Sequence, residues 1–132
     1  MPVGAELRGT SQRQWRGIAP GSRKDLGYFS AGAAALAAAV PVILCESAID
    51  AISCALLHPG HRCVSTSGAR PSPAWLPTLI EQSSEIHCGF DADPTGDQMV
   101  AEMMTLHPRV RRLRPALHDW NDLFRSRAQL VR

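Results

Sequence analysis

The stretch from Cys88 to Met99, CGFDADPTGDQM, restricts the fold of this chain more than any other part of the sequence. Alternating apolar residues lead into Asp91 and Asp93, and a helix-like pattern begins at Pro94. Because side chains two apart on a strand point the same way, the two carboxylates are predicted to project into one space. A shared proton or a cation relieves their repulsion. A hard divalent ion with oxygen ligands, Mg²⁺ or Mn²⁺, is the simplest such cation.

The same residues also have a purely structural interpretation. Asp91 would end a strand, and Asp93 would cap a helix with Pro94 at its first position. A DxD pattern followed by a turn does not by itself distinguish a metal site from a helix cap. Both interpretations therefore stay open at this point.

The length and composition limit the class of protein. A chain of 132 residues is predicted to form one domain with a single ordinary core. Its apolar runs are shorter than the roughly 18 residues of a membrane span, and its N-terminus lacks the order of a signal peptide. The four cysteines form no CxxC pair and are expected to be reduced and mostly buried. We therefore expect a cytoplasmic protein that does not contact membranes.

The distribution of charge is more informative than the net charge of +2. Basic residues gather in the first quarter of the chain and again in the run 109–114. Acidic motifs flanked by basic surfaces are what a metal-dependent site needs to act on a polyanion. Arg8, Arg16 and Lys24 are the candidates to line a nucleic-acid path, with a solvated face of a small sheet as the alternative.

The segment 1–39 is predicted to form a small β extension and a linker. Strand-like segments at 3–8, 14–18 and 27–29 are separated by glycine and proline turns, which indicates an antiparallel ribbon or meander. The alanine-rich segment 30–39 has helical propensity but no polar face, so its state stays open.

From residue 40 the pattern changes to alternating strands and helices. The run VPVILC at 40–45 is typical of a parallel strand that is buried on both faces. Such alternation predicts a parallel sheet with right-handed crossovers. We expect parallel strands at 40–45, 63–66, 85–90 and 110–113, and helices after residue 46 and at 73–81, 94–106 and 119–128.

Several candidate residues follow these predicted strands directly. The carboxyl ends of strands form the edge where open α/β sheets bind ligands. Arg70 follows the turn at Gly68 and could reach a phosphate there, although a surface arginine before a proline is the alternative. The residues at this edge are Glu46, Gly68, Asp91 and Asp93.

Three motifs together resemble a known family. ESAID (46–50), the turn at Gly68 and FDADPTGD (90–97) resemble the signature of the Toprim domain, which bacterial primases, type IA and II topoisomerases, OLD-family nucleases and recombination-mediator proteins share. HDWNDLF (118–124) is similar to the primase-like branch associated with plasmids and mobile elements. The resemblance implies an α/β Toprim (Rossmann-like) fold over 40–132, with about four parallel strands flanked by helices.

The resemblance also implies roles for individual residues. Glu46 would act as general acid or base, and Asp91 and Asp93 would hold Mg²⁺ or Mn²⁺. Asp50 and Asp119 would support a metal.

Two of these assignments have qualifications in the sequence itself. Ser47 with Asp50 also resembles a capping box, in which Asp takes the place of Glu. In the better-known primases the later motif reads Asp-Pro-Asp, whereas Asn121 occupies its last position here and carries no charge.

His118, next to Asp119, is interpreted as a loop histidine.

The chemistry of phosphoryl transfer agrees with these residue types. The reaction needs a cation beside the phosphate oxygens and a carboxylate that passes a proton to or from an oxygen. Glu46, near two aspartates, is expected to have a raised pKa when no metal is bound. We therefore expect primase-like nucleotidyl transfer with DNA or RNA and nucleotides, in replication or plasmid and mobile-element maintenance, and with replication or conjugation proteins as partners. The alternatives are a metal-dependent nuclease and a non-catalytic nucleic-acid-binding accessory module.

Overall fold

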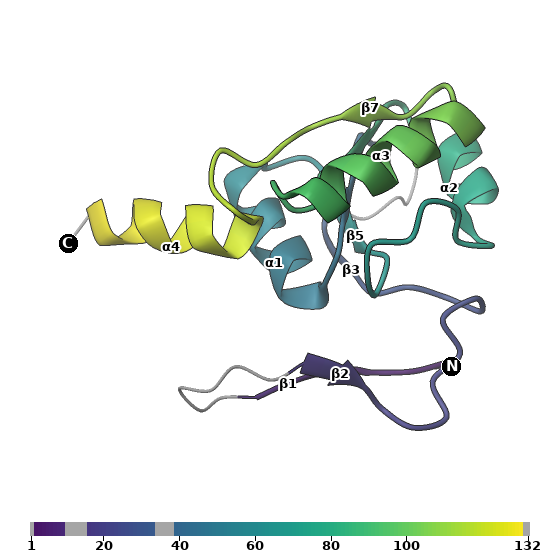
Figure 1. Cartoon of the computed structure of the whole chain (residues 1–132), viewed down its shortest axis with the longest axis horizontal. Coiled ribbons are helices and arrows are strands. Elements are labelled where there is room, and N and C mark those ends of the chain that lie inside the picture. The colour runs from purple at the N-terminus through teal and green to yellow at the C-terminus, as the bar shows by residue number, and fades with distance from the viewer. Residues whose placement is uncertain (1, 10–15, 34–38, 131–132) are drawn as a thin grey trace.

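A computed structural model gives the fold of the chain for residues 2–9, 16–33 and 39–130 (Figure 1). The order of the elements confirms the alternation of strands and helices predicted from residue 40 onward. In chain order they are β1 (Glu6–Arg8), β2 (Arg16–Ile18), β3 (Ser30–Gly32), β4 (Val42–Cys45), α1 (Ala48–Leu57), β5 (Arg62–Ser65), α2 (Leu76–Gln82), β6 (Ile86–Cys88), α3 (Pro94–Leu106), β7 (Arg111–Arg112) and α4 (Trp120–Leu130).

A five-stranded sheet in the order β3-β5-β4-β6-β7 forms the centre of the molecule. The strands β5, β4, β6 and β7 run parallel, as predicted, and β3 joins β5 antiparallel at one edge. Ile43 in β4 lies opposite Cys63 on one side and His87 on the other. The chain passes from β4 to β5 on one side and later to β6 on the other, so the strand order reverses at β4.

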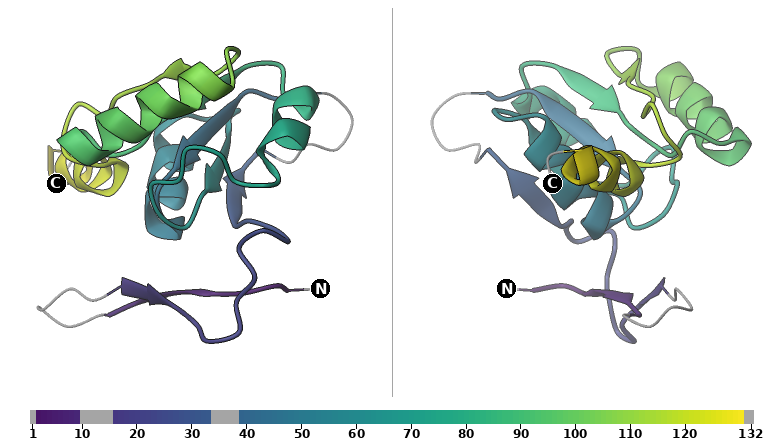
Figure 2. Two further views of the ribbon diagram at one scale, coloured as in Figure 1. Left: turned by 45° about the vertical axis from the view of Figure 1, so that its right-hand side comes forward. Right: turned by 90° about the vertical axis from the view of Figure 1, so that its left-hand side faces the viewer.

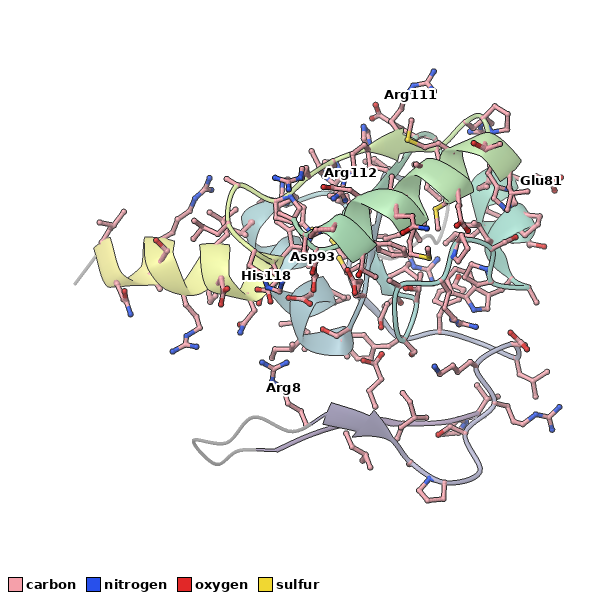
Figure 3. All side chains as sticks on the ribbon, in the orientation of Figure 1. Arg8, Glu81, Asp93, Arg111, Arg112 and His118 are labelled. Atoms are coloured by element: carbon pink, nitrogen blue, oxygen red, sulfur yellow. The ribbon has the colours of Figure 1, made fainter. Side chains whose placement is uncertain are left out.

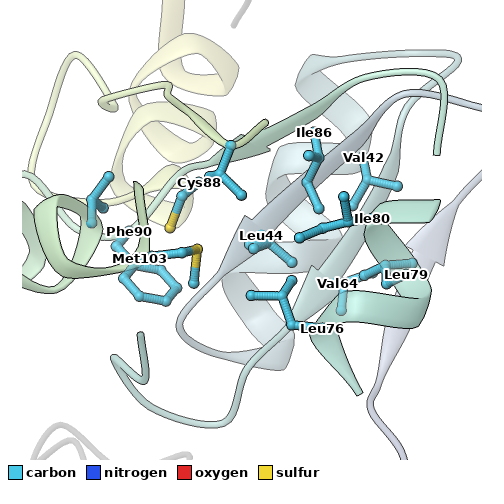
Figure 4. Close-up of a cluster of buried hydrophobic side chains, with 12 residues drawn as sticks. Val42, Leu44, Val64, Leu76, Leu79, Ile80, Ile86, Cys88, Phe90 and Met103 are labelled. Carbon is cyan, nitrogen blue, oxygen red and sulfur yellow. The ribbon is translucent and has the colours of Figure 1, made fainter. Parts of the chain in front are cut away.

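The continuous apolar run of β4 supplies two cores, one on each face of the sheet. Val42 and Leu44 point to the face that α2 and α3 cover, whereas Ile43 and Cys45 point to the face that α1 and α4 cover. Because side chains alternate along a strand, a strand covered on both faces needs apolar residues at every position. The first core also contains Val64, Leu76, Leu79, Ile86, Cys88, Phe90 and Met103 (Figure 4).

The strands β1 and β2 form a separate antiparallel ribbon outside these layers, which confirms the predicted N-terminal extension (Figures 1 and 2). Glu6 fixes the ribbon to the main body. Its Oε1 accepts a hydrogen bond from the backbone N–H of Ala48 at 2.8 Å, and its Oε2 accepts bonds from the hydroxyls of Ser65 and Ser67. A single carboxylate thus joins β1 to the first residue of α1 and to the end of β5.

The main difference from the sequence prediction concerns the segment before β4. A strand was predicted at 27–29 as part of the N-terminal ribbon, but the strand found is β3, and it belongs to the main sheet. Gly32 permits this pairing, because it has a φ of 90° and a Cβ there would lie 2.4 Å from the carbonyl oxygen of His61. The predicted strand residues 14–15 and the alanine-rich residues 34–38 lie outside the described residues.

Candidate metal and nucleic-acid site

Glu46 and Asp91 meet where the strand order reverses. Glu46 follows β4, and Asp91 lies three residues after the end of β6, its neighbour in the sheet. The backbone N–H of Asp91 donates to Glu46 Oε2 at 2.7 Å, and the N–H of Gly68 donates to the Glu46 carbonyl at 2.7 Å. Three residues that the sequence placed at one edge therefore lie in direct contact, at the position where open α/β sheets bind ligands.

Asp93 both caps α3 and faces the site. Its Oδ1 accepts a hydrogen bond from the N–H of Gly96 at 2.7 Å, with Pro94 in the first turn, so the capping interpretation is confirmed. Its Oδ2 lies 3.0 Å from His118 Nε2. Gly96 allows the tight turn, because a Cβ there would lie 2.1 Å from the Asp91 carbonyl oxygen. The cap therefore fixes one oxygen of Asp93 and leaves the other directed at the site.

His118, predicted from the sequence as a loop histidine, lies among three aspartates. Figure 3 shows it beside Asp93. Its Nε2 is 3.0 Å from Asp93 Oδ2 and 4.0 Å from Asp91 Oδ2, and its Nδ1 is 3.5 Å from Asp119 Oδ2. It does lie in the loop before α4, as predicted. The carbonyl of His118 also accepts a hydrogen bond at 2.7 Å from the N–H of Ala92, the residue between the two aspartates.

Ser47 caps α1, and Asp50 in the first turn of α1 bonds both to this cap and to the start of α4. Ser47 Oγ accepts a hydrogen bond from the Asp50 N–H at 3.2 Å and donates to Asp50 Oδ2 at 2.8 Å, so the capping interpretation is confirmed here too. Asp50 Oδ1 accepts from the N–H of Asn121 at 3.2 Å. The carboxylates of Asp50, Asp91 and Asp119 nevertheless each present an oxygen within 4.8 Å of the others.

Burial and negative neighbours change the acidity of the site. Asp91 is 4% exposed, and its burial, followed by the charges of Glu46, Asp50 and Asp119, raises its pKa to about 7. A raised pKa for Glu46 stays a prediction from the sequence, and the structure gives Asp91 as a carboxyl with a raised pKa.

Asp93 and His118 are shifted in the opposite sense, toward their charged forms. The hydrogen bond from Gly96, and then that with His118, lowers the pKa of Asp93. The hydrogen bond with Asp93 raises the pKa of His118. The site without a metal therefore favours a positive charge at the position of the imidazole.

The arrangement of donors fits a divalent cation. Two groups of three side chains, each with ligand atoms within 4.8 Å of one another, share Asp91. Carboxylate oxygens are the donors that Mg²⁺ and Mn²⁺ prefer, and a nearby cation offsets the burial and the negative neighbours that raise the pKa of Asp91. The groups are Asp91, Asp93 and His118, and Asp50, Asp91 and Asp119.

Arg112 holds the backbone that carries Asp91. Its guanidinium donates to the carbonyl of Phe90 at 2.6 Å, to that of Asp91 at 3.1 Å and to Asp97 Oδ1 at 2.6 Å. The side chain comes from β7 and is 19% exposed (Figure 3). It joins the end of β6 to the first turn of α3, and the planar guanidinium suits such a set of fixed acceptors.

A groove of about 390 Å³ lies between the ribbon and α1 and reaches Glu46. The charged residues of its wall are Glu6, Arg8 and Glu46. Arg8 and Gly68, both nucleic-acid candidates from the sequence, line the groove. Its apolar lining consists of Leu7, Ile18, Ile49 and Ile52.

The other candidate basic residues have different surroundings. Arg70 donates from Nε to the Thr66 carbonyl at 2.8 Å and forms an ion pair with Asp25 at 3.4 Å. Lys24 Nζ donates to the Ser67 carbonyl at 2.8 Å. These two cations stabilise the turn around Gly68, so a phosphate there would have to compete with contacts inside the protein. Arg16 lies in β2.

A comparison with protein families matches residues 43–124, more than half of the chain, to a family described as Toprim-like. The chain belongs to the Toprim-like family. The matched segment includes the acidic side chains and the histidine of the site. These are Glu46, Asp50, Asp91, Asp93, His118 and Asp119. A comparison of the sequence with curated proteins gave no match.

Solved structures from bacteriophage T7 share the fold of this Toprim-like chain. The primase fragment of the T7 primase-helicase superposes with a TM-score of 0.64 at 17% identity, over 94% of this chain and 53% of that one. Primase domains in a complex of T7 lagging-strand DNA polymerase, an RNA/DNA hybrid and dTTP give 0.65 at 18% identity, over 95% of this chain and 66% of the other. The chain thus spans between half and two thirds of the chains that it resembles.

Within the residues that the structure describes, every helix is too short or too polar to cross a membrane.

Three residues of the site were not identified from the sequence: His118, Arg112 and Glu6. His118 stands beside Asp119 in the HDWND motif, and this adjacency was the available signal. Arg112 was one of several arginines in the run 109–114, and Glu6 was one acid in a predicted strand. Their contacts span 15 to 61 residues of sequence, so no local pattern could distinguish them.

Proposed function

We propose that this Toprim-like protein is a divalent-metal-dependent enzyme that acts on nucleic-acid phosphodiesters by primase-like nucleotidyl transfer. The observation that carries the proposal is the direct contact between Glu46 and the Asp91 backbone at the point where the strand order reverses. This contact supports the proposal because it brings the carboxylate of Glu46, the proposed acid or base, next to the turn that carries Asp91 and Asp93. The groove reaches Glu46 and would give a nucleotide or a nucleic-acid strand access to this carboxylate.

We assign metal binding to the aspartates and proton transfer to Glu46. Asp91 and Asp93 would hold Mg²⁺ or Mn²⁺, with Asp50 and Asp119 as supporting carboxylates. The ion, when bound, would neutralise charge on the phosphate oxygens. Glu46 takes up the proton of the attacking hydroxyl or returns one to the leaving oxygen. The Asp91 N–H holds one oxygen of Glu46 and so orients its carboxylate.

The groove beside Glu46 would guide the nucleic acid. Arg8 and Gly68 line it. We assign the phosphate contacts to Arg8, Arg16, Lys24 and Arg70, together with the turn at Gly68. The aliphatic side chains of the groove give a base an apolar surface. We expect DNA or RNA and nucleotides as substrates, replication or conjugation proteins as partners, and the cytoplasm as the place of action.

Glu46→Gln and Asp91→Asn test the proposal. Gln keeps a carbonyl oxygen that can accept the Asp91 N–H, so Glu46→Gln should keep metal affinity within about twofold and reduce turnover about 10²–10⁴-fold. Asp91→Asn should instead weaken the binding of Mg²⁺ and Mn²⁺ in calorimetry. Glu81→Gln, an exposed position on α2, is the matched control (Figure 3).

The reaction products decide between the candidate activities. Extension of a chain from nucleotides on single-stranded DNA supports nucleotidyl transfer, whereas cleavage of the strand assigns a nuclease. Nucleic-acid binding with no turnover in any metal leaves an accessory module. Unchanged turnover in Glu46→Gln would contradict its role as acid or base.

A further inference from the structure

We propose that His118 is a ligand of the metal at this site and makes the site prefer a transition ion such as Mn²⁺ over Mg²⁺. The inference rests on the proposed function, which puts a divalent ion between Asp91 and Asp93. One ligand of the ion would then be the imidazole of His118, and the other protein ligands would be carboxylates.

The distances between the side chains are those of neighbouring metal ligands. Around an octahedral ion with bonds of about 2.1 Å, adjacent ligand atoms lie roughly 3 Å apart and opposite ones roughly 4.2 Å apart. His118 Nε2 lies 3.0 Å from Asp93 Oδ2 and 4.0 Å from Asp91 Oδ2. The three atoms therefore face a common space of the right size. The side chain of His118 is 52% exposed, so an ion and its water molecules can enter.

The second nitrogen of His118 has the partner that is typical of a metal-binding histidine. Such residues direct the ring nitrogen away from the metal toward a carboxylate, which fixes the orientation of the ring. His118 Nδ1 lies 3.5 Å from Asp119 Oδ2. The other oxygen of Asp119 accepts the N–H of Asp122 at 2.7 Å in the first turn of α4. Asp119, assigned above as a supporting carboxylate, thus also orients the imidazole of His118.

The backbone gives a third, independent reason. The carbonyl of His118 accepts the N–H of Ala92, which lies between Asp91 and Asp93 in the sequence. This bond ties the loop before α4 to the turn that carries the two aspartates, although 26 residues separate them in the sequence. The backbone of His118 is therefore tied directly to the turn that carries the two aspartates.

The imidazole should change which ion binds. Mg²⁺ favours oxygen ligands and keeps several waters, whereas imidazole nitrogen suits transition ions. Replacing His118 by Gln offers a hard amide oxygen of similar reach. The substitution should therefore lower the affinity for Mn²⁺ and leave that for Mg²⁺ nearly unchanged.

The test measures Mn²⁺ and Mg²⁺ affinities by calorimetry and Mn²⁺ coordination by pulsed electron paramagnetic resonance, on the full chain with ¹⁵N-labelled histidine. We expect a coupled ¹⁵N in the wild type that His118→Gln removes, together with a roughly tenfold lower Mn²⁺ affinity. Asp119→Asn should also lower the Mn²⁺ affinity about tenfold, which is within the range known for residues that contact and orient a metal ligand. His107→Gln is the control, because His107 ends α3 at the helix terminus opposite Asp93.

The outcomes separate this inference from the proposed function. If Asp91→Asn abolishes Mn²⁺ binding but the wild type shows no coupled ¹⁵N and His118→Gln keeps the ion preference, the metal site stands and the role of His118 is refuted. If the wild type binds neither ion, both proposals fail. Loss of the ¹⁵N signal in His107→Gln would also refute the assignment to His118.

Discussion

At the scale of single residues, Asp91 combines two properties that rarely occur together in a stable protein. It is almost completely buried, and this burial, followed by the charges of Glu46, Asp50 and Asp119, raises its pKa to about 7. A strand end or a helix cap alone would give no reason for such a cost. A metal site would explain this cost in free energy, because a bound cation would remove the repulsion between the carboxylates.

We predict that Asp91→Asn stabilises the metal-free protein by an amount that increases with pH. The pKa of Asp91 is about 7 in the folded state and 3.8 when unperturbed, so the folded state holds the extra proton between these values. Its contribution to the free energy of unfolding falls as the pH rises through this interval. The variant should match the wild type near pH 4 and exceed its stability at pH 8, by up to about 4 kcal/mol.

Urea denaturation in EDTA from pH 4 to pH 8 measures this difference. Addition of Mn²⁺ at pH 8 should stabilise the wild type alone and so reverse the order of the two proteins. A difference between them that stays constant over the whole pH range would contradict the prediction.

At the scale of elements, the turn between β6 and α3 depends on a strand of two residues. The strand β7 is short and lies at the edge of the sheet, yet it carries Arg112, whose guanidinium binds the carbonyls of Phe90 and Asp91. The same guanidinium pairs with Asp97 in α3. The strand thus matters for the geometry of the acidic turn more than for the sheet itself.

We predict that Arg112→Ala lowers the free energy of unfolding by about 2–3 kcal/mol, because it leaves charge-assisted bonds to buried carbonyls unmade. It should also weaken Mn²⁺ binding. Arg112→Lys keeps the charge but lacks the planar fork, so it should restore only part of either property.

Arg111→Ala is the matched control for this prediction. Arg111 neighbours Arg112 on β7 but is exposed and donates only to the nearby carbonyl of Pro108 among the contacts of the described residues. Its substitution should change stability by less than about 0.5 kcal/mol. Equal effects at the two positions, measured by urea denaturation and calorimetry, would show that Arg112 has no special role.

At the scale of the whole molecule, the ribbon and the sheet make the groove together. The ribbon contributes Arg8, and the main body contributes Glu46 and Gly68. Glu6 fixes the ribbon through the start of α1 and the end of β5. Neither part has the groove by itself, so a nucleic acid bound there would contact both.

We predict that Arg8→Gln reduces the salt dependence of binding to single-stranded DNA. The loss of one phosphate contact should lower the slope of log K against log salt by about 0.7. Fluorescence anisotropy with a labelled oligonucleotide from low to high salt measures this slope. Arg111→Gln, at the opposite end of the molecule (Figure 3), should leave it unchanged, and an equal effect of both variants would exclude the groove as the binding path.

The sequence predicted the elements with strong local signals. The apolar run at 40–45, the Pro94 start of α3 and the alternation of strands and helices gave the parallel sheet and the Toprim-like fold. The sequence did not predict β3, because alanine and glycine carry no strand pattern and the pairing depends on a positive φ at Gly32. It placed Gly68 and Arg70 near the site but could not show that Arg70 is engaged with Thr66 and Asp25.

The sequence by itself determined which side chains stand at the ends of which strands, because alternation, turns and caps are properties of neighbouring residues. Only the tertiary structure decided that Glu46, Asp91 and His118 share one site, since 72 residues separate the first from the last. Sheet order and the packing of α4 against α1 set those distances. Local sequence specifies the elements, and the burial of two apolar faces brings their polar ends together.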